Sequence, residues 1–123
     1  MSAARRWREL LRCLWPSLLV ATCWAAGAQA HEVRPAYLDI REASPGHFDV
    51  TWKVPARGEY RLGLHARLPE GCVGAPAQGA FVDDAFVERW QARCQDGLVG
   101  GTIAIDGLSA TRTDVLVRVQ HGD

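Results

Sequence analysis

The sequence predicts an all-β fold, a small antiparallel immunoglobulin-like β-sandwich that follows a cleavable signal peptide. Apolar and polar residues alternate with a period of two in several stretches beyond residue 35, which is typical of half-buried strands. Turn-forming residues separate these stretches at roughly 10-residue spacing, as in sandwiches and barrels. The leader aside, no segment has helical periodicity. The immunoglobulin order Cys…Trp…Cys is absent, so the likeness is one of architecture.

The first 30 residues have the composition of an export signal. A basic start is followed by an uncharged run over 13–28, and the segment ends in the small-x-small sequence Ala28-Gln29-Ala30. The run would be about 24 Å long as a helix, shorter than the roughly 30 Å of a bilayer core, and Pro16 interrupts it. We therefore expect cleavage after Ala30 and a periplasmic or secreted domain over 31–123. A leader that is not cleaved would leave the protein membrane-associated.

Two other export signals are weaker in this sequence. The stretch "LVATC" (19–23) approaches a bacterial lipobox, but Thr22 stands where a smaller residue is expected. The pair Arg5-Arg6 lacks the rest of a twin-arginine pattern. Ordinary secretion is the favoured interpretation.

Removal of the leader changes the charge and the cysteine count. Four of the 14 Lys and Arg and one of the 14 Asp and Glu precede residue 31, so the mature domain carries a net charge of −3. No basic stripe remains, and nucleic acid is therefore not an expected partner. Cys72 and Cys94 remain as an even pair, which in an exported domain predicts a disulfide. The alternative, a metal site, has no CxxC spacing to support it. The disulfide would contribute about 3 kcal/mol by chain entropy.

The first elements form a predicted hairpin over 36–54. Ala36, Leu38 and Ile40 share one face of the first strand, and Phe48, Val50, Trp52 and Val54 share one face of the second. "ASPGH" (43–47) supplies the turn.

Further strands are predicted over 60–68, 86–94, 102–105 and 114–119, with a Gly-, Pro- and Ala-rich loop over 69–80. Glu88 is out of place on the apolar face of its strand. Asp83-Asp84 and Asp106-Gly107 are predicted turns. The last strand would be an edge open to mispairing, and we expect a further element to follow it.

Several phrases of the mature sequence together resemble the exported N-terminal region of HupE/UreJ-type membrane proteins. These phrases are "HEVRPAYLDI", "FDVTWKVPARGEYRLGL", "LPEGC", "VERWQARC", "GGTIAIDGL" and "TDVLVRV". The resemblance implies a signal peptide, a periplasmic β-domain and a bundle of transmembrane helices, in a group associated with nickel or cobalt uptake. The bundle is not among these 123 residues. We therefore expect a truncated gene product or a free-standing domain, whose partner is a membrane permease or the missing transmembrane part.

The sharpest chemical hypothesis concerns His31. As the first residue of the mature chain, it could chelate one metal through its α-amine and imidazole, with Cu(II) favoured by affinity. A second imidazole would come from His47, His65 or His121, and Glu32 adds a carboxylate suited to nickel or cobalt. No HxH or HxxxH spacing pairs these residues, so the alternative of solvated histidines stays open.

Three functions follow, in order of preference. The first is an accessory domain that presents nickel, cobalt or copper to a membrane permease. The second is a metal-free structural or protein-interaction sandwich. The third is an oxidative copper enzyme, which would need a histidine brace. The sequence contains no nucleophile elbow, HExxH or phosphate loop, so an enzyme is the least supported class. We therefore expect no enzyme.

Overall fold

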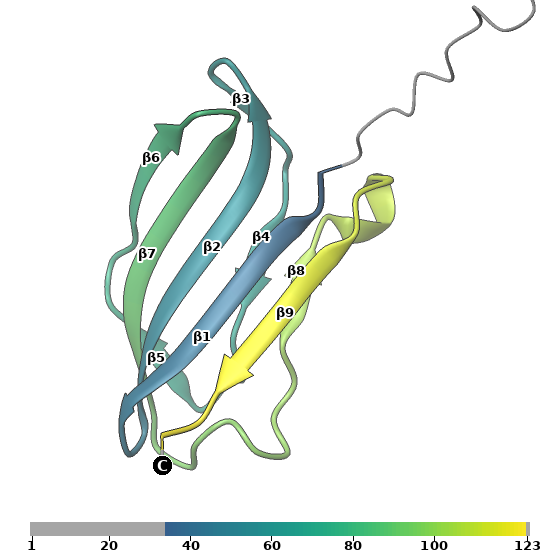
Figure 1. Ribbon diagram of the computed structural model, residues 1–123. Coiled ribbons are helices and arrows are strands. Elements are labelled where there is room, and N and C mark those ends of the chain that lie inside the picture. Colours follow the sequence, from purple (N-terminus) through teal and green to yellow (C-terminus); the bar gives the residue numbers. More distant parts are fainter. Residues whose placement is uncertain (1–33, 123) are drawn as a thin grey trace, which may run out of the picture. The chain divides into compact units, whose positions relative to one another are not determined.

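The computed structural model describes residues 34–122 of the chain (Figure 1). The predicted leader, His31 and Glu32 lie outside the described residues. The elements in chain order are β1 (Ala36–Ser44), β2 (His47–Arg57), β3 (Tyr60–Arg61), β4 (His65–Arg67), β5 (Cys72–Gly74), β6 (Gln78–Val82), β7 (Ala85–Cys94), β8 (Ala104–Asp106), the short 3₁₀ helix η1 (Leu108–Ala110) and β9 (Val115–Gln120).

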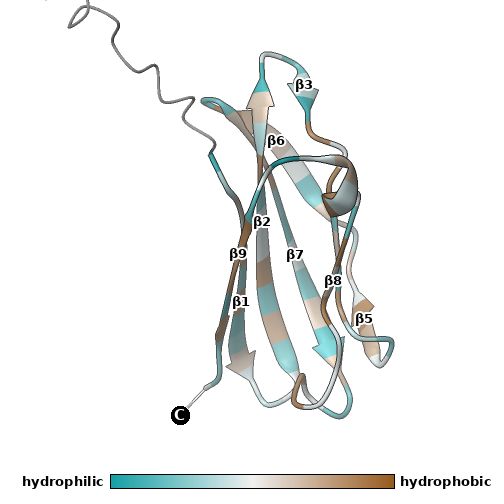
Figure 2. Cartoon of the chain, turned by 90° about the vertical axis from the view of Figure 1, so that its right-hand side faces the viewer, coloured by the Kyte–Doolittle hydropathy of each residue, from teal (hydrophilic) through white to brown (hydrophobic). Residues whose placement is uncertain are grey.

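The strands form two layers, which confirms the predicted all-β, sandwich-like fold. The large sheet has the order β5-β7-β2-β1-β9, with β3 paired to β2 and β6 paired to β7. The small sheet contains β4 and β8, and Figure 2 shows β8 standing apart from β1, β2 and β9. Within residues 34–122 no helix is long and apolar enough to cross a membrane.

The predicted hairpin supplies most of the core. Leu38 and Ile40 of β1 and Val54 of β2 have no exposed surface, and Trp52 is 1% exposed. The Trp52 indole Nε1 donates a hydrogen bond of 3.3 Å to the carbonyl of Leu64, which enters the core from the link between the layers. Each large buried side chain contributes about 1.5–3 kcal/mol through the area that it removes from water.

One strand pair departs from the predicted antiparallel arrangement. β9 pairs with β1 in parallel, so that Ala36 lies opposite Val115 and Ile40 lies opposite Val119. In Figure 1 both strands start at the same end of the sheet, which β9 reaches by way of η1. Alternation of side chains predicts that a strand exists but carries no information on its direction, so the sequence could not distinguish the two cases.

The predicted strand over 60–68 is divided in two. β3 extends the large sheet and β4 belongs to the small sheet, because the chain changes layers between them. Leu64 lies at this change of layer and is fully buried. Gly63, beside Leu64, was the sequence signal for the interruption.

The predicted loop over 69–80 contains one strand and the start of another. β5 and β6 both pair with β7, but their side chains are mostly exposed and show no alternation of apolar residues. Gly79 allows the close approach of β6, because a Cβ atom there would lie 2.5 Å from Cζ of Phe86. These edge strands are held by backbone bonds, which a search for apolar periodicity does not detect.

The predicted turns are confirmed. Gly46 and Gly107 have φ of 75° and 84°, and a Cβ atom at Gly107 would overlap the Gly63 carbonyl. Asp83, with φ of 51°, and Asp84 form the turn before β7. The predicted strand over 102–105 begins two residues later, as β8.

Candidate binding sites

The structure separates the predicted metal ligands that it describes. His47 is exposed at the start of β2, where its Nδ1 lies 3.2 Å from the Pro45 carbonyl oxygen. His65 is exposed on the other sheet, opposite Asp106, whose carboxylate is held by Arg67.

His121, the remaining candidate, follows β9. Its Nδ1 lies 3.8 Å from Oε2 of Glu42, which also accepts the N–H of Gly122 at 3.1 Å. The other oxygen of Glu42 accepts the Gly46 N–H at 3.1 Å. These backbone hydrogen bonds, first that of Gly122 and then that of Gly46, hold the pKa of Glu42 below its ordinary value. The carboxylate therefore ties the end of β9 to the hairpin turn.

No group of three or more potential ligands occurs within residues 34–122. A metal site built from His47 and His65 thus has no support from the geometry. The participation of His31 and Glu32 stays a prediction, since both precede the described residues.

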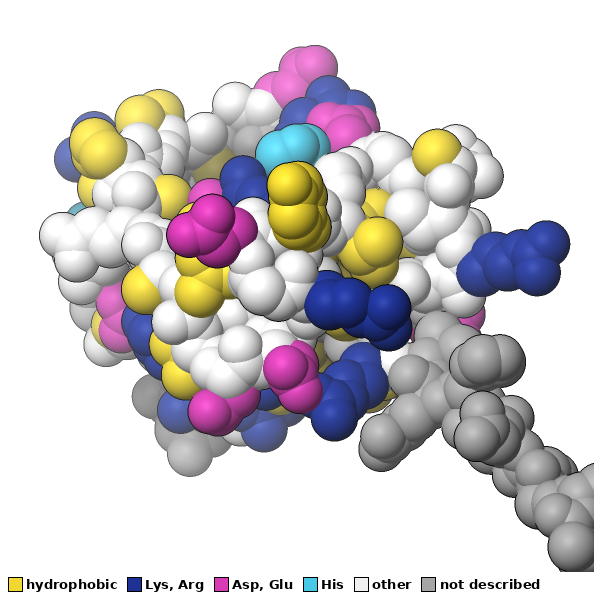
Figure 3. Space-filling model, turned by 90° about the horizontal axis from the view of Figure 1, so that it is seen from above, with side chains coloured by type: hydrophobic (Ala, Val, Ile, Leu, Met, Phe, Trp, Pro, Cys, Tyr) yellow, Lys and Arg dark blue, Asp and Glu magenta, His cyan; other side chains and the backbone are white. Residues whose placement is uncertain are grey.

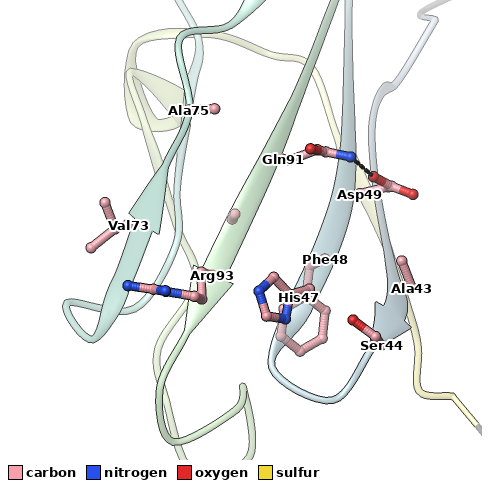
Figure 4. A pocket seen from close by; sticks show the side chains of 10 residues that line it. Ala43, Ser44, His47, Phe48, Asp49, Val73, Ala75, Gln91 and Arg93 are labelled. Atoms are coloured by element: carbon pink, nitrogen blue, oxygen red, sulfur yellow. Dashed lines mark hydrogen bonds between the residues drawn. The ribbon is translucent and has the colours of Figure 1, made fainter.

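A groove lies beside β5 (Figure 4). It has a volume of about 400 Å³, and its lining includes His47 and Asp49 of β2 and Gln91 and Arg93 of β7. Gln91 Nε2 donates to Asp49 Oδ1 at 3.1 Å. The groove offers hydrogen-bond donors and acceptors, but this carboxylate already has an amide partner. It contains no nucleophile paired with a base.

Two arginines that flank His65 in the sequence, Arg61 and Arg67, are ion-paired. Arg67 Nη2 donates to Asp106 Oδ1 at 2.9 Å. Arg61 Nη1 lies 3.3 Å from Glu88 Oε2, and its guanidinium lies 4.2 Å from the centre of the Phe86 ring. This contact explains why Glu88 is tolerated on an apolar face. Figure 3 shows acidic and basic side chains interspersed over the end of the molecule that it presents.

A buried carboxylate joins β9 to β1. Asp39 is 7% exposed and accepts hydrogen bonds from Arg118 Nε at 2.6 Å and from Arg41 Nε at 2.8 Å. The Arg118 hydrogen bond is the largest cause of a pKa of Asp39 below its ordinary value. Arg118 is the one charged residue of β9, and it shares the Asp39 carboxylate with Arg41.

The last strand, predicted over 114–119 as an edge strand, is β9, and it lies at the edge of the large sheet. Leu116 is 55% exposed, Val117 48% and Val119 37%, although Leu38 and Ile40 beside them on β1 are fully buried. Within residues 34–122 no strand pairs with the outer side of β9. The signal in the sequence was "VLVRV", an apolar strand with a single charge.

The predicted disulfide is confirmed. Cys72 of β5 is bonded to Cys94 of β7, and the two residues lie directly opposite each other in the sheet. The bond anchors the other edge of the large sheet.

Comparison with protein-family models, with curated proteins and with solved structures found no match.

Proposed function

We propose that the chain is an extracytoplasmic protein-interaction domain that binds a partner strand along β9. The observation that carries this proposal is the exposed row of apolar side chains on a strand with an open edge. Exposed apolar edges of this kind are rare on strands that have no partner, because they template aggregation. This is the second of the functions predicted from the sequence.

The backbone of β9 supports strand addition. Ala36 N–H donates to the Asp114 carbonyl at 2.9 Å, and Ala36 lies opposite Val115. In a parallel ladder with this register, the backbone groups of Leu116 and Arg118 point toward β1. The N–H and C=O groups of Val115, Val117 and Val119 therefore point outward, where another strand can pair with them.

The broader setting follows from the sequence resemblance. An exported domain of the HupE/UreJ type would act in the periplasm, beside a permease or a transmembrane bundle, and a strand of such a protein is a suitable partner. Metal presentation to that permease would rest on His31 and Glu32. Its test is intact mass spectrometry of the exported protein after addition of Cu(II) or Ni(II). Retention of one ion, lost in His31→Ala, would support it, and retention of none at micromolar metal would contradict it.

Photo-crosslinking in the cells that produce the protein tests the interaction. A photoreactive phenylalanine replaces Leu116 on β9 or, as the matched control, Tyr60, which is 85% exposed on β3. The proposal expects protein adducts from position 116 and few from position 60. Equal yields from the two positions, or no adduct from position 116, would overturn it.

A further inference from the structure

We propose that β9 pairs with β9 of a second copy of this chain, in an antiparallel register centred on Val117. This inference rests on the proposed function and names its partner. The resulting dimer would have a two-fold axis perpendicular to the large sheet, and the two large sheets would become one continuous sheet.

The backbone geometry suits this register. With Val117 opposite Val117 of the second copy, Val115 lies opposite Val119, and Val119 opposite Val115. These are the residues whose N–H and C=O groups point outward, and directly opposed residues of this type exchange both hydrogen bonds. Each outward group of β9 thereby finds a partner.

The side chains are self-complementary in the same register. The three valines share the face of β9 that continues the core row of Leu38 and Ile40. In the dimer each valine would lie beside a valine of the second copy, about 5.5 Å away between Cα atoms. On the other face Leu116 would lie opposite Arg118, which can cover it with its aliphatic stem.

Charge decides against the competing register. Only registers centred on Val117 or on Arg118 keep the side chains on matching faces and pair most of β9. Centring on Arg118 would place two guanidinium groups directly opposite each other, which destabilises a strand pair. Centring on Val117 separates them, and each stays bonded to Asp39 of its own copy.

The small contact predicts a weak dimer. One pair of six-residue strands buries less than the roughly 1,200 Å² of a stable interface. We therefore expect a dissociation constant of about 10–100 µM, in the range of transient assemblies.

Sedimentation velocity over about 10 µM to 1 mM of the exported protein tests the dimer. Val117→Lys places two ammonium groups on the axis and should weaken association at least tenfold. Val99→Lys is the control, because Val99 is 86% exposed in the loop between β7 and β8 and outside the proposed contact. Thermal unfolding checks that each variant folds.

A mixture of Val117→Lys with Val117→Asp then tests the register. Opposite charges would meet on the axis, so the mixture should associate although each variant alone should not. Three results would overturn the inference: a monomeric wild-type chain at about 1 mM, a dimer that Val117→Lys leaves unchanged, or a mixture that stays monomeric.

The two proposals fail differently. A monomeric wild-type chain that still forms protein adducts from position 116 in cells would overturn the second copy as partner and retain the interaction edge. Adducts that consist of two copies of this chain support both. A monomer without adducts overturns both.

Discussion

The two edges of the large sheet differ in how continuous their edge strands are. Both expose apolar side chains, including Val73 and Phe81 on one side and Leu116 and Val117 on the other. The first edge is made of β5 and β6, which are separate short strands divided at residues 75–77, with Pro76 between them. The second edge is the uninterrupted six-residue strand β9.

The difference lies in the backbone. A broken edge offers no long row of outward N–H and C=O groups, and a disulfide holds its end to β7. β9 offers such a row, and its one charged residue, Arg118, is bonded to Asp39. Apolar exposure alone therefore does not identify the interacting edge, whereas exposure together with an unbroken ladder does.

Removal of the disulfide should have the largest effect. In the double variant Cys72→Ser, Cys94→Ser the unfolding free energy should fall by about 3 kcal/mol, because the unfolded chain gains the entropy of an open loop. Urea denaturation measures the loss, and amide exchange should increase first in β5 while β9 stays protected on its inner side. An unchanged denaturation midpoint would show that the edge made of β5 and β6 does not depend on the disulfide.

Asp39→Asn should have the next largest effect. Asparagine cannot hold two guanidinium groups, so the unfolding free energy should decrease by about 2 kcal/mol and β9 should loosen from β1. Asp49→Asn is the control, since Asp49 is exposed and bonded to a neutral amide. Equal losses in the two variants would argue against a special role for the carboxylate under β9.

Acid should destabilise the side of the large sheet where β9 pairs with β1. The pKa values of Asp39 and Glu42 are lowered from the ordinary 3.8 and 4.5. Their stabilisation is therefore complete above those values and is lost as the pH falls through the lower folded pKa. Urea midpoints should decline below about pH 4.5 and less steeply in Asp39→Asn. A decline of the same steepness in that variant would contradict the assignment.

A smaller effect is expected at the broken edge. Gly79→Ala would bring a Cβ atom 2.5 Å from Cζ of Phe86, so the ring or β6 must move, at a cost of about 1 kcal/mol. Gly63→Ala meets no atom within 4 Å and serves as the control. A loss in the control that equals the loss at Gly79 would indicate a general glycine effect.

The sequence predicted the parts of this structure that depend on burial. The alternation in 36–54 identified the central hairpin, and the even cysteine pair identified the disulfide. It could not predict the parallel direction of β9 or the strands β5 and β6, because backbone pairing determines these and leaves no apolar period.

The same limit applied to the candidate sites. Histidine and carboxylate residues can be read from a sequence, but their distances cannot, and the structure places His47 and His65 on different sheets. The sequence predicted an edge strand over 114–119, but not how far its side chains would be exposed. Their exposure depends on which strands the small sheet covers.

The most direct test of the interaction edge is amide hydrogen exchange of β9 at two protein concentrations. In dilute protein the amides of Val115, Val117 and Val119 should exchange rapidly, while those of Leu116, Arg118 and Gln120 are protected by β1. At about 1 mM the three valine amides should become protected and the other three should change little. Valine amides that are already protected in dilute protein, or that stay unprotected at the higher concentration, would contradict the pairing of β9 with a second copy.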